Sequence, residues 1–586
     1  MSQNLTKQLK RGIIKIKEME VICLVKEIWN EPAVNKEKIA ELKKDDRLFA
    51  VPDIVLNVLI NRGIEDTDEI VKFLKADIND LHDTMLMKDA DLATDILIDA
   101  IIANEKIIIS TDFDVDGCCA AAVGVLALRK LGANVDYYVN NRFTQGYGLC
   151  RSGIDEILEK HPDTKILMTA DNGIVAFDAV EYAKNRGLTV VVTDHHEQGN
   201  RLPAADAVVD IKRNDETYPC KFLCGTGVVF KLMCLIYQKL QMKIRSVYKY
   251  LDIVALATVA DVVPLLDENR ILVQKGLMII NQKPSKIFRA FAEVCGVKTE
   301  VNSHYTLGYI YGPMINAIGR IDGSPEKAID MFLSDDDEYI RKTVEYLRKV
   351  NADRQEITET QTKMAEDMVD PENVPSVIVV YEPTFHEGIV GLIAGKLKEK
   401  FNRPTIILTK TDNGIKGSAR SVDGFHIKEA FDEISDCLLG YGGHAKAAGL
   451  SIEEDKIEEF TRRINELADK KLTSDDFVRK YRIDSTINEF SISEGIVDEL
   501  KMLEPYGEGF PKPVFLVKDC TVQRKVYLSE GKHIKLITPY FPILLWDKGE
   551  DYKEMMEPQI VSVIGFPEIN TYRGQVTLQF TGRSFK

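Results

Sequence analysis

The chain has 586 residues, of which 45% are hydrophobic and 29% are charged, as in ordinary globular proteins. At roughly 150 residues per domain, this length predicts about three or four domains. The formal net charge of −16 argues against a protein coated with basic surface for gripping duplex DNA. A narrow, locally basic channel remains compatible with it.

The first 60 or so residues have a charged, helix-like pattern without an apolar core of signal-peptide length. We find no run of about 18 uncharged apolar residues, so we expect no membrane span. The ten cysteines include no C-x-x-C, and Cys220 and Cys224 alone are too few ligands for a closed zinc site. Without an export signal, we expect reduced thiols and a cytoplasmic protein.

Short apolar runs alternate with helix-period segments between about residues 85 and 270. This alternation predicts a mostly parallel sheet that helices cover on both faces. The predicted strands are 106–111, 135–139, 165–170 and 188–193, and the predicted helices include 120–132 and 177–187.

Acidic and imidazole side chains follow three of these strands. In an open parallel sheet, ligands gather beyond the carboxyl ends of the strands, so we expect these groups to meet. Asp261 lies in an otherwise apolar run, where an unpaired carboxylate would be very costly to bury. The full set is Asp112, Asp114 and Asp116 after 106–111, Asp171 after 165–170, Asp194, His195 and His196 after 188–193, and Asp261.

Carboxylates that converge on one point repel each other unless cations neutralise them. An oxygen-rich set with one or two imidazoles suits Mn²⁺ or Mg²⁺ better than structural zinc, and the ligands suffice for two ions. Two ions about 3.5–4 Å apart clamp a phosphodiester and activate water. Taken alone, 112–116 could be a solvated turn or a capped helix start, and 194–196 a helix cap with surface imidazoles. The clusters together favour the metal site.

The rest of the chain changes character twice. Residues 325–370 are charged and helix-periodic, which predicts a long connecting helix with a solvated face. Strand–helix alternation returns over 373–460. The final segment, 475–586, is rich in Val, Ile, Tyr, Phe and glycine turns and predicts a small barrel.

Four motifs in the order DFDVDG, ADNGI, TDHH and ATVADVVPL resemble those of the DHH phosphoesterase superfamily. YGGHAKAAG at 441–449 resembles the glycine-rich motif of the DHHA1 domain. The segments NRFTQGYGL, NAIGR, HEGIVGLIAGKL and GSARS narrow the resemblance to the RecJ family of single-strand-specific exonucleases, over roughly residues 60–586.

The resemblance implies an α/β fold in which a parallel-sheet DHH domain and a smaller α/β DHHA1 domain are joined by a long helix and followed by an OB-like barrel. The implied domains are a helical extension at 1–60, DHH at 61–325, the connecting helix at 326–370, DHHA1 at 371–470 and the OB-fold at 471–586.

The same resemblance assigns roles to the acids. Asp114 and Asp116 would each hold one ion, and Asp171 would bridge both. His195 and Asp261 would complete the shell of the second ion. All of these residues would be catalytic through the metals that they bind.

Two more residues would lie at the edge of this centre, and two positions depart from the family pattern. His196 would sit beside the second ion or on the scissile phosphate, and Asp112 would be a ligand or an outer acceptor. Ser110 stands where some superfamily members carry a histidine ligand. Met314 stands where an arginine phosphate contact is expected.

A separate set matches positions that bind nucleic acid and its 5′ phosphate. The planar fork of arginine suits phosphate oxygens, and glycine lets backbone N–H groups approach them. An alternative for 441–449 is a tight turn followed by close helix packing. His386 could equally be a capping or core histidine. The implied binding set is Arg142, Arg320, Ser418, Arg420, Gly443 and His444.

The function implied is 5′-to-3′ exonuclease action on single-stranded DNA, releasing mononucleotides with two Mn²⁺ or Mg²⁺ ions, in DNA recombination and repair. The groove between the DHH and DHHA1 domains would admit one strand but no duplex. The implied partners are single-stranded DNA, a single-strand-binding protein and a RecQ-type helicase. Tyr527, Tyr540, Trp546 and Tyr572 of the barrel are available for stacking on the strand or for packing within the barrel.

Two other functions are open. One is a DHH phosphodiesterase that acts on oligoribonucleotides or cyclic dinucleotides. The terminal barrel argues against it, because such a barrel favours a polymeric substrate. The other is a replication scaffold without catalytic activity. The acids and histidines of the predicted metal site argue against a scaffold, which would need none of them.

Overall fold

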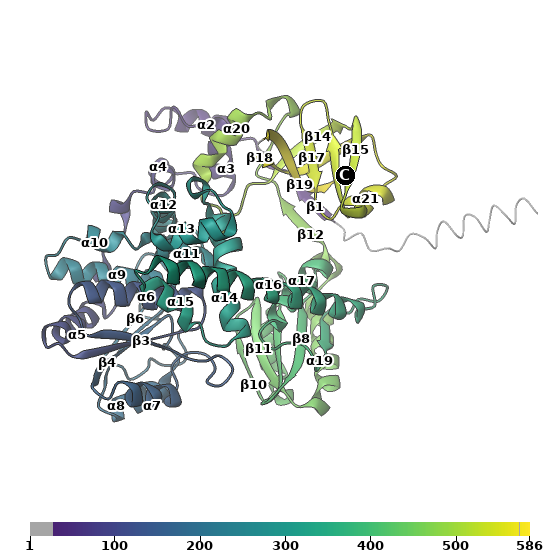
Figure 1. The fold of residues 1–586 in the computed structure, drawn as a ribbon. Coiled ribbons are helices and arrows are strands. Elements are labelled where there is room, and N and C mark those ends of the chain that lie inside the picture. Colours follow the sequence, from purple (N-terminus) through teal and green to yellow (C-terminus); the bar gives the residue numbers. More distant parts are fainter. Residues whose placement is uncertain (1–26, 573–574) are drawn as a thin grey trace, which may run out of the picture.

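The computed structural model describes residues 27–572 and 575–586, which form three bodies, two of them joined by one long helix (Figure 1). The first 26 residues of the predicted N-terminal extension lie outside the described residues. No helix in the described part of the chain is long and apolar enough to cross a membrane.

The first body is built on a five-stranded parallel sheet with the strand order β3-β2-β4-β5-β6. Its strands are nearly continuous apolar runs because helices cover both faces. The four predicted strands are confirmed, while the four-residue β6 was too short to be recognised. The strands are β2 Lys106–Thr111, β3 Val135–Val139, β4 Thr164–Ala170, β5 Thr189–Asp194 and β6 Ala207–Asp210.

Alternate residues of β2 serve the two faces of this sheet. Ile107 and Ile109 belong to the larger core, and Ile108 belongs to the smaller one. Helix α6 begins at Val115, five residues before the predicted start, because the Asp114 side chain caps it by accepting from the Gly117 N–H at 3.0 Å. The larger core also holds α5 Ala90–Ile102, α6 Val115–Lys130 and α9 Gly225–Lys239, and the smaller one α7 Arg151–Lys160 and α8 Phe177–Asn185.

A further layer of helices packs on α6 and α9 and carries residues that the strands do not supply. Gly276 of α12 lets this helix approach the backbone of Leu251 in α11, where a side chain would overlap. The layer consists of α10 Arg245–Tyr248, α11 Leu251–Ala260, α12 Asp267–Gln282, α13 Lys286–Cys295, the π-helical η4 Thr306–Tyr311, α14 Gly312–Ile321 and α15 Glu326–Leu333.

The predicted connecting helix is present as α16, Asp337–Asp367, which crosses from the first body to the second (Figure 1). Asp336 caps its N-terminus by accepting from two backbone N–H groups. Its first half buries Val344 and Leu347 in the first core, and its last turns bury Ala365 in the second body. One face of the helix is therefore buried at both ends.

The second body contains a five-stranded mixed sheet with the order β10-β11-β9-β8-β7. Residues 440–452 form a β-hairpin, so the alternative of a turn followed by helix packing for 441–449 is wrong. The strands are β7 Ile378–Tyr381, β8 Thr405–Thr411, β9 Gly414–Arg420, β10 Gly440–Gly443 and β11 Ala447–Ile452, and the helices are α17 Val390–Phe401, α18 Ile427–Glu433 and α19 Ile457–Lys471.

The C-terminal body is an OB-like sheet with the order β13-β14-β18-β19-β17-β16-β15. Its strands are β13 Ser485–Thr486, β14 Phe515–Thr521, β15 Arg524–Leu528, β16 His533–Ile537, β17 Pro542–Leu545, β18 Ile560–Tyr572 and β19 Gln575–Phe585, with helices α20 Glu494–Leu500 and α21 Gly549–Glu554.

Residues from the start of the chain complete this last body. Strand β1, Glu27–Asn30, pairs in parallel with β12, Arg479–Arg482. Val55 of α3 shares one hydrophobic core with Phe515 of β14. The N-terminal helices of this core are α2 Lys36–Leu42, α3 Asp53–Asn61 and α4 Thr67–Lys75.

One buried arginine joins the first body to the last. The guanidinium of Arg270, 1% exposed, donates to the carbonyl oxygens of Phe73 (2.9 Å), Leu503 (3.0 Å), Glu504 (2.9 Å) and Pro505 (3.2 Å). It also lies 3.5 Å from the centroid of the Phe73 ring. Burial lowers its pKa to about 9, which still leaves it charged at neutral pH.

Replacing this arginine should loosen the C-terminal body. Arg270→Met keeps the apolar stem but leaves buried carbonyl oxygens without donors, at a cost of about 1–3 kcal/mol per group. We expect the first transition in urea unfolding to shift to lower denaturant, and the linker around Leu503 to become sensitive to protease. Arg245→Met, at an exposed arginine of α10, is the matched control. Equal unfolding curves for both variants would contradict a joining role for Arg270.

Candidate active site

The predicted acidic and imidazole residues come together at the carboxyl ends of β2, β4 and β5. Asp261 reaches them from the C-terminal end of helix α11 rather than from a strand. Three overlapping groups each bring their ligand atoms within 4.8 Å of one another: Asp112, Asp114 and Asp171; Asp171, His195 and His196; and Asp116, His195 and Asp261. Because Asp171 and His195 belong to two groups each, the groups form adjacent parts of one centre.

The backbone around Asp171 is shaped to bring it into this centre. Asp171 has a φ of +64°, a left-handed conformation that is uncommon outside glycine. A Cβ on Gly225, at the start of α9, would lie 2.5 Å from the Cβ of Asp171, so only glycine fits there. Such local strain persists where the surrounding structure holds it, and it is typical of functional sites.

Asp116 is held by the N-terminus of helix α9. Its two carboxylate oxygens accept from the backbone N–H groups of Gly225 (2.6 Å) and Thr226 (2.9 Å). Free N–H groups and the helix dipole both favour a negative charge at this end of a helix. Asp116 is therefore fixed in orientation before any ligand arrives.

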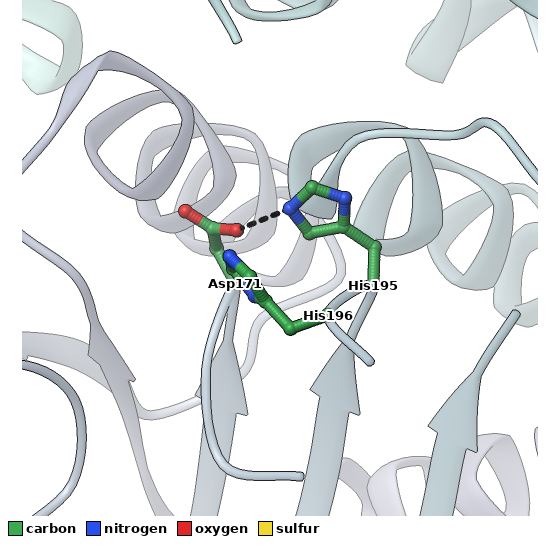
Figure 2. A group of neighbouring side chains, drawn as sticks. All are labelled: Asp171, His195 and His196. Carbon is green, nitrogen blue, oxygen red and sulfur yellow. Dashed lines mark ion pairs between the residues drawn. The ribbon is translucent and has the colours of Figure 1, made fainter. Parts of the chain in front are cut away.

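His195 occupies the middle of the cluster. Its Nε2 lies 3.0 Å from Oδ1 of Asp171, the ion pair that Figure 2 marks with a dashed line. The nearest carboxylate oxygens of Asp116 and Asp261 each lie 3.7 Å from the same nitrogen. The contact with Asp171 lacks hydrogen-bond geometry. Burial lowers the pKa of His195 to about 4, so the ring is neutral at physiological pH and has a lone pair for a ligand.

Several buried polar atoms in this cluster have no hydrogen-bond partner among the described residues. They are Oδ1 of Asp112, Oδ1 of Asp171, Oδ2 of Asp261, and both ring nitrogens of His195. Leaving such atoms unpaired is costly, and their convergence on one point fits divalent cations. Oxygen-rich ligands with an imidazole are the donors that suit Mn²⁺ and Mg²⁺.

The pKa values of four carboxylates in the cluster are raised, as expected for a site that binds cations. Burial is the main cause that raises the pKa of Asp112, Asp171 and Asp261 well above the ordinary value, and neighbouring carboxylates raise them further. The pKa of Asp114 is raised for the same two reasons. Positive charge is needed to keep these groups ionised together, and bound metal ions would provide it.

Asp194 supports the site from behind. Its Oδ1 accepts from the His195 N–H (2.7 Å) and pairs with Nδ1 of His196 (2.7 Å), and its Oδ2 accepts from the Ile174 N–H (2.9 Å). Burial opposes its ionisation, but the hydrogen bond with His196 and the charge of that imidazole lower its pKa below the ordinary value. Asp194 therefore holds the ring of His196 and the backbone of His195.

His196 lies on the open side of the cluster. Its side chain is 37% exposed, and the hydroxyl of Tyr147 lies 3.2 Å from Nε2. Burial lowers its pKa, but the hydrogen bond with Asp194 and the charges of Asp261 and Asp114 outweigh this and raise it to about 9. The ring is thus available as a cation that faces solvent.

The two positions that depart from the family pattern are both buried. Ser110 lies inside β2, and its carbonyl oxygen accepts from the Asn172 amide. Met314 of α14 is 2% exposed, and its sulfur lies 3.5 Å from that of Cys295. Met314 thus contributes to the core of the first body.

Four arginines gather next to the acids, at the junction of the first two bodies. Burial and then the like charges of Arg142, Arg354 and Arg420 lower the pKa of Arg320 to about 10. Burial likewise lowers the pKa of Arg142, while the charges of Asp112 and other acids counteract it. Four mutually repelling guanidiniums in one place are suited to bind an anion.

Arg354 of this cluster was missed in the sequence. It lies midway along α16, in a charged segment where periodicity gives no reason to single out one arginine. Its Nε is buried without a hydrogen-bond partner among the described residues. The connecting helix thus adds a guanidinium to the cluster.

Glycines bring the second body close to these arginines. A Cβ on Gly388 would overlap the carbonyl oxygen of Arg320, and one on Gly391 would lie 3.0 Å from both Nη2 of Arg420 and Oγ of Ser418. Arg420 Nη1 donates to Ser418 Oγ at 3.0 Å. Arg320, Ser418 and Arg420 therefore share one location near the start of α17.

Gly443 and His444 lie in the turn of the β10–β11 hairpin, at the end of the sheet where Ala447 of β11 pairs with Arg420 of β9. Gly443 has a φ of +143°, and the His444 N–H donates to the Ala447 carbonyl oxygen at 2.8 Å. The His444 side chain is exposed. In the described part of the chain, no contact joins it to the arginines.

Comparison with known proteins gives family matches along most of the chain. The DHH family N-terminal domain matches residues 106–258, the DHHA1 domain matches 375–470 and the RecJ OB domain matches 483–583. The single-stranded-DNA-specific exonuclease RecJ of Bacillus subtilis is 31% identical over 555 residues, which cover 93% of this chain and 69% of the relative.

Solved structures give the same result. The crystal structure of RecJ in complex with Mn²⁺ from Thermus thermophilus is similar with a TM-score of 0.82 and 27% identity, covering 96% of this chain and 80% of that one. Its complex with Mg²⁺ gives a TM-score of 0.76 and 26% identity, covering 96% and 78%. The three bodies therefore have the arrangement of a known nuclease fold.

Proposed function

Because the chain belongs to the RecJ family of single-stranded-DNA-specific exonucleases, we propose that it removes mononucleotides from the 5′ end of single-stranded DNA by hydrolysis with two Mn²⁺ or Mg²⁺ ions. The observation that carries the proposal is the set of buried, unpaired oxygen and nitrogen atoms on Asp112, Asp171, Asp261 and His195. A phosphodiester is an anion, so it can approach these carboxylates only when bound cations supply positive charge between them.

In this proposal Asp114 and Asp116 would each hold one ion, and Asp171 would be shared between the two. His195 and Asp261 would complete the shell of the second ion, and Asp112 would act as a ligand or an acceptor beside it. When bound, the ions lower the pKa of the attacking water and neutralise charge on the phosphate. Asp194 holds His196 as a cation at the open side, where it can contact a non-bridging phosphate oxygen.

The arginine cluster supports a 5′ phosphate site next to the metals. Arg142 is close enough to Asp112 and Asp114 for their charges to affect its pKa, so a phosphate held by the arginines would lie near the acids. A fixed phosphate end places the next phosphodiester at the metals, which favours mononucleotide products. Ser418, Gly443 and His444 of the DHHA1 body complete the proposed binding set.

We propose the division into domains expected from the sequence, with the three family matches inside the DHH, DHHA1 and OB segments. At its N-terminal end this division differs from the packing, because helices α2, α3 and α4 share the core of the OB body. We propose a cytoplasmic location, supported by the free state of every cysteine among the described residues. A single-strand-binding protein and a RecQ-type helicase are the proposed partners, because an enzyme restricted to single strands needs a supply of unpaired DNA for recombination and repair.

End-labelled DNA tests the function directly. We expect hydrolysis of a 5′-phosphorylated single strand to mononucleotides with Mn²⁺ or Mg²⁺, none with EDTA, and little on blunt duplex DNA. A 3′-labelled strand should shorten progressively, while a 5′ label should be released at once. Preference for dinucleotides or for long RNA over long DNA would favour the alternative phosphodiesterase. No hydrolysis with either metal would favour the scaffold.

A further inference from the structure

Two exposed tyrosines stack on each other at the π-helical segment η4. Tyr305 and Tyr309, which we call the tyrosine pair, are 58% and 71% exposed. Their ring centroids are 4.9 Å apart, with 20° between the planes. Two large aromatic rings together in solvent indicate a binding surface, and π-helical turns are frequent at functional sites.

The inner face of η4 fixes the pair next to the metal centre. A Cβ on Gly308 would lie 3.0 Å from Cγ1 of Val259, and one on Gly312 would lie 3.0 Å from Cβ of Ala260. These glycines let η4 pack tightly on the last turn of α11, whose C-cap residue is Asp261. The tyrosine pair projects from the opposite, exposed side of this turn.

The segment also borders the C-terminal body. His304, next to Tyr305, makes an edge-on ring contact with Tyr506 at 5.4 Å. The tyrosine pair therefore lies on a segment that contacts both the helix carrying Asp261 and the C-terminal body.

We propose that the tyrosine pair is a base-stacking platform for the nucleotides that follow the 5′ end of the strand; this rests on the proposed exonuclease function. A single strand is the occupant that matches the exposed rings, because unpaired bases stack on aromatic side chains. Paired bases in a duplex have no free faces there, so the platform adds to single-strand preference.

Steady-state kinetics of the full-length, Mn²⁺-loaded enzyme test this. The double variant Tyr305→Ala/Tyr309→Ala should raise KM about ten-fold for a strand of about 20 nucleotides, because stacking on an aromatic side chain contributes this much or more per base. Its kcat should stay within about two-fold, since no metal ligand has changed. Cleavage of a dinucleotide, too short to reach the platform, should be unchanged.

Two control variants distinguish stacking from other roles. Tyr305→Phe/Tyr309→Phe keeps the aromatic rings and should have a KM near that of the wild-type enzyme. Tyr339→Ala removes an exposed tyrosine from α16, outside the proposed path, and should have no effect. An unchanged KM for the long strand in the double alanine variant would overturn the platform, as would equal losses on long and short substrates, which would indicate a displaced Asp261 instead.

A binding measurement separates failure of the platform from failure of the exonuclease. Strands that carry 2-aminopurine at successive positions are mixed with the full-length protein in EDTA, so that no cleavage occurs. We expect quenching at one or two positions behind the 5′ end, lost in the double alanine variant and kept in the phenylalanine variant. Position-independent fluorescence would refute the platform even if the enzyme cleaves DNA, and it would leave a protein partner as the occupant of the pair.

Discussion

Asp171→Asn should reduce kcat on single-stranded DNA by about 10³-fold or more, since the charge that neutralises both ions contributes several kcal/mol. Asparagine keeps the volume and, unlike alanine, readily adopts the left-handed backbone that position 171 requires. The loss can therefore be assigned to the missing charge. The measurement is single-turnover hydrolysis of a 5′-phosphorylated strand with saturating Mn²⁺.

Thermal unfolding supplies the accompanying control. Burial and neighbouring acids raise the pKa of Asp171 well above its usual range, so removing this charge should leave the metal-free protein at least as stable. Mn²⁺ should stabilise the unchanged chain through preferential binding to the folded state, and the variant less. Asp163→Asn, at the exposed turn before β4, should behave as the unchanged chain. Full activity of Asp171→Asn would exclude its bridging role.

Arg420→Ala should slow cleavage of a 5′-phosphorylated strand by about 10- to 100-fold, because charged hydrogen bonds contribute about 1.5–3 kcal/mol each. The same strand with a 5′ hydroxyl should lose only a few-fold. Arg420 lies with Arg320 and Ser418 at the proposed phosphate site, so the difference between the two ends measures that contact. The assay compares kcat/KM for the two strands.

Two further variants sharpen this comparison. Arg420→Lys keeps the charge but lacks the planar fork, so it should recover only part of the preference for phosphorylated ends. Arg462→Ala removes an exposed arginine of α19 that pairs with Glu466, and it should leave the preference intact. Equal losses for Arg420→Ala on both kinds of end would place the 5′ phosphate elsewhere.

The convergence of the acids and histidines was predictable from the sequence, because it follows from where the strands end. A strand such as 106–111 is recognisable from apolar composition, and parallel strands that share a sheet bring their carboxyl ends to one edge. Asp112, Asp171 and His195 therefore meet for reasons that the sequence shows. Asp261 was found only because a lone acid in an apolar run needs a partner.

Features that depend on packing between distant segments were not predictable in this way. Arg354 looks like any other charge of a solvated helix until α16 is placed at the junction of two bodies. Arg270 lies in a helix of ordinary amphipathic pattern, and its carbonyl partners lie more than 190 residues away in the chain. The tyrosine pair could not be singled out in the sequence, because only the packing of η4 on the last turn of α11 places it near Asp261.

The pairing of β1 with β12, and of α3 with the core of the OB-like sheet, has a consequence for the way in which this protein is made. On the ribosome, Val55 and its apolar neighbours must wait for almost the whole polypeptide before Phe515 emerges to cover them. During that interval they are candidates for chaperone binding. Anyone who excises the OB module for isolated study should therefore supply residues 27–75 as well, either fused by circular permutation or added as a second fragment.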